Sequence, residues 1–192
     1  AVQRDFVEFP SQVNEMWILD PQIVDNYARH YQSGERLPQS WIDKLEESST
    51  FNEGHATTSY MAAAILDLAW HSLSSDEVVS DVEKFEAEAI ESYGLAYDCV
   101  PTRYRSSYFS HIFAGGYSAG YYGYIWAEVF DADTGEWFKE NGGLSRKNGD
   151  HLRSKLMSQG GSIDSLEMFR NFRGRDAVIE PLLKRRGLVS NA

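Results

Sequence analysis

The chain has 192 residues, of which 42% are hydrophobic and 14% aromatic, and this composition supports a folded core and argues against intrinsic disorder. Its formal net charge of −11 repels phosphate backbones, so no nucleic-acid partner is expected. It has no run of about 18 apolar residues, so no membrane-spanning segment is predicted.

Cys99 is the single cysteine of the sequence, so the chain forms no internal disulfide. The first residues, AVQRDFVEFP, lack the basic and apolar regions of a signal peptide. Together these features predict a cytoplasmic protein.

Capping residues, amphipathic stretches and closing glycines predict helices along most of the chain, and therefore an all-α fold. The helix expected at 55–73, HATTSYMAAAILDLAWHSL, has apolar residues spread around it and should be buried on most sides. The other helices expected in this half span residues 11–20, 20–35, 38–49 and 74–94.

Residues 95–113 break the helical pattern at Pro101, and any strand would lie around 95–110. Helices are expected again at 117–130, within 133–144, and within 148–161, 162–174 and 176–187. No repeat, low-complexity tract or linker divides the sequence, so residues 1–192 are expected to form a single unit.

The segment FAGGYSAGYYGYIWAEVF, residues 113–130, gathers tyrosines beside glycines. On a helix that begins at residue 117, Tyr117, Tyr121 and Tyr124 fall at i, i+4 and i+7 and share one face. Gly115 and Gly116 permit positive φ and a close approach of the backbone, and His111 lies just before them. Phenols, an imidazole and free amides can bind peptide carbonyls or stabilise an oxyanion.

Composition alone favours a simpler interpretation of the same segment. The tyrosines would be core aromatics whose hydroxyls find hydrogen-bond partners, and the glycines would allow close helix packing.

Glu8 lies in DFVEFPSQ, just before Pro10 and an expected helix. The common explanation is a carboxylate favoured by the helix dipole, and the alternative is a zinc ligand. The histidines form no i, i+4 pair and no H-E-x-x-H motif, so the chain by itself cannot complete a zinc-peptidase site of that type. They are His30, His55, His71, His111 and His151.

Three segments, DFVEFPSQ followed by EMW, HIFAGGYSAGYYGYIWAEVF and FRNFRGRDAVIEPLLKRRGL, occur in this order between residues 4 and 188. Together they resemble the C-terminal part of the thimet-oligopeptidase-like zinc metallopeptidases. The six-residue step from His111 to Tyr117 is similar to that of the bacterial peptidyl-dipeptidase branch, and the endopeptidase branch is one residue shorter there.

The resemblance implies a role for each matched residue. Glu8 would be the third zinc ligand, following an H-E-x-x-H that the family carries about two dozen residues upstream and that would precede Ala1. His111, Tyr117 and Tyr124 would be catalytic, contacting the substrate backbone and stabilising the oxyanion. Substrate-binding roles fall to Ala114, Gly115, Gly116 and Tyr121.

The implied activity of the complete enzyme is zinc-dependent hydrolysis of short peptides with release of C-terminal dipeptides, and the isolated chain is expected to be inactive. An arginine would hold the substrate carboxylate, the candidates being Arg103, Arg105, Arg170, Arg173 and Arg175. Two alternatives stay open: a thimet-type endo-oligopeptidase, and a non-catalytic helical module that binds peptides. Apolar surface left uncovered on a partial fold would also favour a dimer of the chain.

Overall fold

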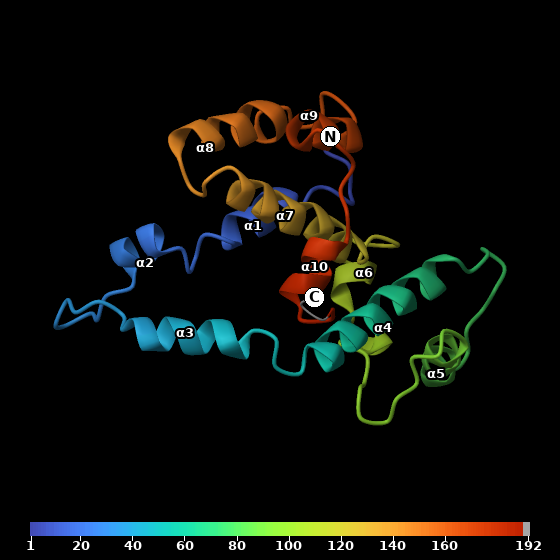
Figure 1. Cartoon of the computed structure of the whole chain (residues 1–192). Helices are drawn as coiled ribbons and strands as arrows, with labels where there is room; N and C mark the ends of the chain where they lie inside the picture. Colours follow the sequence, from blue (N-terminus) through green and yellow to red (C-terminus); the bar gives the residue numbers. More distant parts are fainter. Residues whose placement is uncertain (190–192) are drawn as a thin grey trace. The chain divides into compact units, whose positions relative to one another are not determined.

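The computed structural model describes residues 1–189, and its regular secondary structure is helical (Figure 1). The all-α prediction is confirmed, because these residues form no strand and pair as β-bridges only at Arg29–Arg36 and Tyr97–Val100. The chain divides into two compact units: unit 1 takes residues 1–51 and the chain from Ile125 onward, and unit 2 takes residues 52–124. The expectation of a single unit over 1–192 stays a prediction; residues 190–192 lie outside the described part.

Unit 1 is built around α7, whose first two residues belong to unit 2. Its helices are α1 (Phe9–Glu15), α2 (Pro21–Tyr27), α3 (Gln39–Ser48), α7 (Gly123–Glu140), α8 (Arg146–Leu152), the π-helical turn η2 (Arg153–Met157), α9 (Ser165–Arg173) and α10 (Glu180–Arg185).

The core of unit 1 is rich in phenylalanine, which packs edge to face and stacked. Phe6 stacks on Phe9 with 4.8 Å between ring centroids, and Phe130 of α7 meets Phe169 of α9 edge-on at 5.0 Å. The buried cluster comprises Phe6, Phe9, Val13, Ala127, Phe130, Phe138, Leu152, Leu156, Met168, Phe169 and Phe172. The N-terminal segment is therefore tied to α7 and to the C-terminal helices by burial of apolar rings.

Two buried carboxylates of α7 fix the C-terminal segment to that helix. Asp133 accepts hydrogen bonds from Arg173 Nε at 2.9 Å and from Arg175 Nη2 at 2.7 Å. Asp131 forms an ion pair with Arg185 of α10. Buried charges of this kind are tolerated because each is paired and hydrogen-bonded.

Unit 2 contains α4 (Glu53–His71), α5 (Val82–Ser92), the 3₁₀ turn η1 (Ser106–Tyr108) and α6 (Ser110–Phe113). The expected burial of the long helix is confirmed, since α4 buries Tyr60, Ala62, Ala63, Ala64, Leu66 and Asp67. The Trp70 ring lies 4.2 Å from that of Phe85, which joins α4 to α5.

Several helices differ in length from the sequence prediction. The helix expected at 20–35 ends at Tyr27, because the chain then turns back through Gly34, which adopts φ +72°, and His30 N–H bonds Glu35 O at 2.8 Å. The helix expected at 74–94 starts only at Val82, where Asp81 caps it.

The helix expected at 117–130 instead begins at Gly123 and continues to Glu140, joining two predicted helices into α7. Gly135 lies inside α7 and faces Met16, whose Sδ is 3.6 Å from the position of a Cβ. The helix passes through this glycine because helical packing outweighs its weak propensity.

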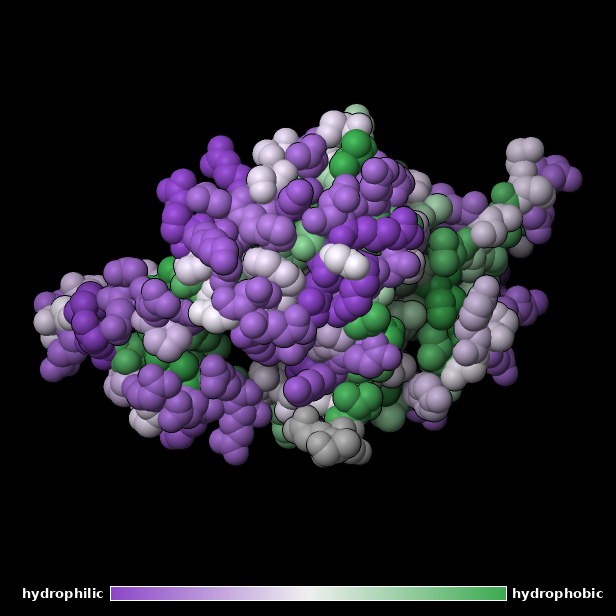
Figure 2. All heavy atoms as spheres, turned by 45° about the horizontal axis from the view of Figure 1, so that its top comes forward, coloured by the Kyte–Doolittle hydropathy of each residue, from purple (hydrophilic) through white to green (hydrophobic). Residues whose placement is uncertain are grey.

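Figure 2 shows apolar side chains on the displayed surface among hydrophilic ones. Large hydrophobic residues that stay exposed include Tyr31, Trp41, Phe51 and Val78. Within residues 1–189, no helix combines the length and the apolar character that crossing a membrane requires.

Candidate substrate-binding site

Four side chains of unit 2, here called the tyrosine cluster, lie against one another: His111, Tyr117, Tyr121 and Tyr124. The Tyr117 and Tyr124 rings are stacked, with centroids 5.2 Å apart and planes at 15°. His111 meets Tyr117, Tyr121 and Tyr124 edge-on at 5.9, 5.8 and 6.2 Å. Three phenols thus gather beside one imidazole, all within one compact unit.

The predicted helix face is not what brings these rings together. Residues 117–122 form a turn between α6 and α7, so Tyr117 and Tyr121 lie outside any helix. Ala119 adopts φ +53°, a left-handed conformation that stops the helix from extending backward. The turn is closed by Gly120 N–H, which donates to Tyr117 O at 2.8 Å, and by Tyr117 N–H, which donates to His111 O at 3.0 Å.

The glycine pair before this turn has a folding reason of its own. A Cβ at Gly115 would lie 2.9 Å from both His111 Cα and His111 O, closer than a side chain tolerates, and Gly116 adopts φ +79°. The two glycines therefore close α6 and reverse the chain. Ala114, Gly115 and Gly116 are exposed, and their contact with a substrate stays a prediction.

Tyr121 is the buried member of the cluster, with 3% of its surface exposed. Burial raises the pKa of Tyr121 to about 12, while the charge of Arg103 acts in the opposite direction. Its hydroxyl is therefore a neutral hydrogen-bonding group at neutral pH. This burial suits packing, whereas His111, Tyr117 and Tyr124 are half-buried; substrate contact stays a prediction for all four.

Tyr104 extends the cluster, and sequence reasoning missed it. Its ring stacks on Phe109 at 4.8 Å and lies 5.8 Å from His111 and 6.0 Å from Tyr121. The available signal was the alternation of aromatic and polar residues in YRSSYFSH, which places several rings directly ahead of His111.

The structure separates the five arginines proposed to hold a substrate carboxylate. Four are paired with carboxylates of the chain: Arg105 with Glu86, Arg170 with Asp176, and Arg173 and Arg175 with Asp133. Of the five, Arg103 is the one with no carboxylate partner within residues 1–189. It is exposed, and its guanidinium carbon lies 5.9 Å from the centroid of the Tyr104 ring.

Glu8 stands at the N-cap position of α1, half-buried, without a side-chain cap hydrogen bond. Ser11 Oγ donates to Glu8 O at 2.8 Å. Glu8 belongs to unit 1 and the tyrosine cluster to unit 2, and the expectation that they line one cleft stays a prediction.

Carboxylate oxygen is a ligand that zinc accepts, so the chemistry of Glu8 fits the metal. A zinc site needs at least three protein ligands, however, and the described residues gather no group of three or more His, Cys, Asp or Glu that could hold one. Residues 1–189 therefore do not make a zinc site by themselves.

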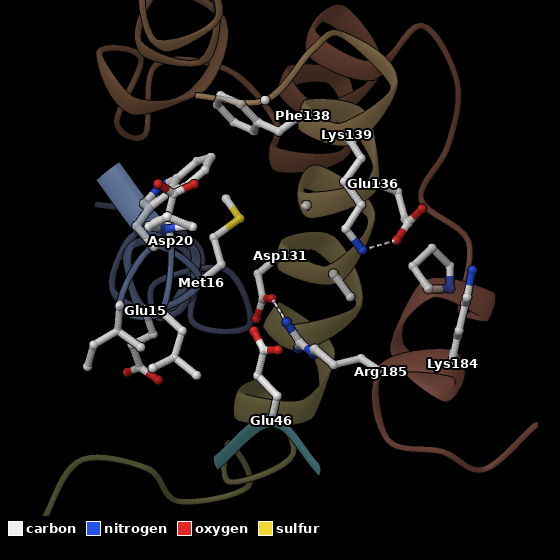
Figure 3. Close-up of a pocket in the computed structure, with 18 residues that line it drawn as sticks. Glu15, Met16, Asp20, Glu46, Asp131, Glu136, Phe138, Lys139, Lys184 and Arg185 are labelled. Atoms are coloured by element: carbon white, nitrogen blue, oxygen red, sulfur yellow. Dashed lines mark hydrogen bonds and ion pairs between the residues drawn. The ribbon is translucent and has the colours of Figure 1, made fainter. Parts of the chain in front are cut away.

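Unit 1 has a cavity of about 770 Å³ among the C-terminal end of α1, α7 and α10 (Figure 3). Two pairs of charged side chains in its lining are matched: Asp131 points toward Arg185, and Lys139 Nζ lies 2.7 Å from Glu136 Oε1. Met16 and Phe138 supply apolar wall. None of the site residues predicted from the sequence lines this cavity, so the tyrosine cluster stays the candidate site.

Comparison with known proteins gives the same family over nearly the whole chain. A curated dipeptidyl carboxypeptidase of Escherichia coli (strain K12) is 46% identical over 185 residues, covering 96% of this chain and 27% of that protein. A probable cytosolic oligopeptidase A of Arabidopsis thaliana is 34% identical over 194 residues, 98% of this chain and 27% of that protein. Oligopeptidase A of Escherichia coli (strain K12) is 31% identical over 188 residues, 98% of this chain and 28% of that protein.

The chain thus spans 27% to 28% of the length of these relatives. The sequence model of peptidase family M3 matches residues 1–188. This match covers all the elements described above and confirms the resemblance read from the motifs. The chain belongs to peptidase family M3.

Proposed function

We propose that this chain is the substrate-binding C-terminal part of a zinc peptidase that releases dipeptides from the C-terminus of short peptides. The observation that carries the proposal is the convergence of two half-buried phenols, Tyr117 and Tyr124, on the imidazole of His111. The 46% identity to a dipeptidyl carboxypeptidase supports this choice of reaction.

The chemistry proposed for the cluster is hydrogen-bond donation. Phenol O–H and imidazole N–H groups that are fixed in place before the reaction stabilise negative charge as it develops on a carbonyl oxygen. The stacking of Tyr117 on Tyr124 at 5.2 Å holds both phenols against free rotation. Because such donors act most strongly in the transition state, they should raise kcat more than they lower KM.

Zinc is proposed only for the complete peptidase, in which Glu8 would be one ligand and an H-E-x-x-H outside residues 1–189 would supply the others. The bound metal would supply Lewis-acid activation of the carbonyl and of water.

Tyrosine-to-phenylalanine substitutions in the complete peptidase test the function. Tyr117→Phe and Tyr124→Phe should each lower kcat about 10²- to 10³-fold, with a smaller change in KM, because one donor to the oxyanion is lost. Tyr108→Phe is the matched control, since Tyr108 is 61% exposed and its ring lies 6.5 Å from that of Tyr104, and it should keep kcat. Full hydrolysis by both cluster variants would refute the proposal.

The main alternative to an enzyme is a non-catalytic helical module that binds peptides. It predicts peptide affinity without hydrolysis even when the upstream gene sequence is expressed. An in-frame H-E-x-x-H encoded about two dozen residues before Glu8 favours the enzyme, and a stop codon or unrelated sequence there favours the module.

Arg103 is the residue we propose to hold the C-terminal carboxylate of the substrate, because it is exposed and close to Tyr104. Arg103→Ala should raise KM about 10- to 100-fold for peptides with a free C-terminus and leave C-terminally amidated peptides unaffected. Arg170→Ala, which removes an arginine already paired with Asp176, is the control. Equal effects on both kinds of peptide, with internal cleavage seen by mass spectrometry, would favour the endo-oligopeptidase alternative.

We also propose a cytoplasmic location, from the lone Cys99. Dimerisation of the chain through exposed apolar side chains stays a prediction. Size-exclusion chromatography with light scattering tests it, and a monomer at high protein concentration would contradict it.

A further inference from the structure

Asp67 is a fully buried carboxylate within the apolar run MAAAILDLAW of α4. An ionised carboxylate is costly to bury unless hydrogen bonds replace its water. The Ala119 N–H donates to Asp67 Oδ1 at 2.9 Å, and the Tyr121 N–H donates to Asp67 Oδ2 at 2.9 Å. His71 Nδ1 lies 2.8 Å from Oδ1. Both carboxylate oxygens are thus occupied, and both receive an amide from a segment more than fifty residues away.

Both amides belong to the turn of residues 117–122. Ala119, whose amide Asp67 holds, is in the left-handed region at φ +53°, which residues other than glycine rarely adopt. A charged acceptor forms stronger hydrogen bonds to backbone amides than a neutral one. Asp67 therefore stabilises the turn at Ala119, the residue whose own backbone preference disfavours this conformation.

Tyr60 holds the same turn from the same helix face, seven residues before Asp67. Its hydroxyl donates to Tyr121 O at 2.7 Å, and its ring stacks on that of Tyr121 at 5.2 Å. The amide and the carbonyl of Tyr121 are thus both held by α4. Tyr121 in turn packs against Tyr124 at 5.5 Å, so its position sets that of the cluster.

We propose that Asp67 is the positioning residue of the tyrosine cluster. From α4 it fixes the backbone of residues 117–122 and, through that backbone, the places of Tyr117, Tyr121 and Tyr124. The structural part of this proposal depends on the hydrogen bonds alone, and the effect of Asp67 on catalysis rests on the proposed function.

Amide hydrogen exchange followed by NMR tests the structural part on the full chain. Asp67→Asn keeps the shape but turns one oxygen into an N–H donor, which leaves one turn amide without its acceptor. The amide of Ala119 or of Tyr121 should then exchange about tenfold faster or more.

Glu86→Gln is the matched control. Glu86 is a second buried carboxylate of unit 2 and accepts from Ser106 N–H at 2.8 Å, away from the turn. This variant should leave exchange of the Ala119 and Tyr121 amides unchanged. Equal exchange of these amides in Asp67→Asn and Glu86→Gln would overturn the proposal.

Kinetics of the complete peptidase test the catalytic part. Asp67→Asn should lower kcat about tenfold or more with a smaller change in KM, because the donors are displaced from the transition state. Adding Ala119→Gly should recover part of the lost kcat, because glycine adopts this φ without strain.

The outcomes separate the two proposals. If Tyr117→Phe and Tyr124→Phe both keep full activity, the proposed function fails, and the exchange result still decides the role of Asp67 in the turn. If Tyr117→Phe loses activity but Asp67→Asn keeps kcat despite fast exchange, the positioning role in catalysis is refuted.

Discussion

Gly115 shows how one residue can be required by the backbone around it. A methyl group there would meet His111 Cα and O at 2.9 Å, and neither atom can move without shifting α6. The resemblance implied a substrate-binding role for this glycine, whereas composition alone favoured close helix packing. The structure gives a reason within the fold, because the loop packs onto the helix that carries His111.

Gly115→Ala should destabilise the chain by about 1–3 kcal/mol, because the added methyl group overpacks this contact. It should also displace His111 from Tyr117 and Tyr124. Urea unfolding and the NMR shifts of the His111 ring measure the two effects. Gly149→Ala is the control: a Cβ there meets nothing within 4 Å, and alanine in α8 should stabilise by about 0.5–1 kcal/mol. A Gly115→Ala variant as stable as wild type would show that the loop relaxes freely.

At the scale of elements, the docking of the C-terminal segment on α7 depends on Asp133. Although burial raises the pKa of this carboxyl, hydrogen bonds from Arg175 and Arg173 outweigh it, and the pKa lies below its ordinary value of 3.8. Asp131 shows the opposite balance, because burial outweighs the bond from Arg185 and raises its pKa. Folding therefore favours the ionised form of Asp133 and the protonated form of Asp131.

Asp133→Asn should destabilise unit 1 by about 1–3 kcal/mol, because it removes the charged acceptor of hydrogen bonds from Arg173 and Arg175. Asp150→Asn, which breaks the exposed pair with Arg146, should cost about 0–1 kcal/mol. Thermal unfolding of both variants at neutral pH measures the difference, and equal costs would contradict it.

The pH dependence follows from the lowered pKa of Asp133. Its contribution to stability is fully present above the ordinary pKa of 3.8 and is lost as the pH falls through the lower folded-state value. Wild type should therefore lose more stability than Asp133→Asn when the pH falls below 3.8. Unfolding curves of both proteins through that range test this, and parallel losses would refute it.

Patterns local in sequence predicted most helices, whereas contacts distant in sequence decided the rest. Asp20 caps α2 and Pro21 is its first residue, and both are start signals that act within one turn. The left-handed Ala119 has no local signal, since alanine favours helix. Asp67 was detectable only as a single carboxylate inside an apolar run, and the two amides that it holds lie more than fifty residues away.

At the scale of the whole molecule, the family match covers nearly all of the chain, but it does not by itself place a metal site among the described residues. The chain matches family M3 over residues 1–188, yet the described residues gather no metal-binding group. The motifs identified the candidate residues through resemblance. The arrangement of Glu8 relative to the tyrosine cluster depends on two separate units, and no local pattern predicts it.

The 192-residue chain by itself should bind zinc weakly and release no dipeptides, because one carboxylate ligand does not complete a site. Its thermal midpoint should be the same in zinc and in EDTA, whereas the complete peptidase should lose stability in EDTA. Calorimetry and a peptide assay measure both effects. Tight zinc binding by the 192-residue chain would contradict this view.

The two contacts of α4 with the turn, through Tyr60 and Asp67, constrain the number of residues that separate them in the chain. Tyr60 and Asp67 lie on one side of the helix only because seven residues make close to two turns. One inserted or deleted residue between them would rotate one of these two side chains about 100° around the helix axis relative to the other. We therefore expect insertions and deletions to be excluded from this interval.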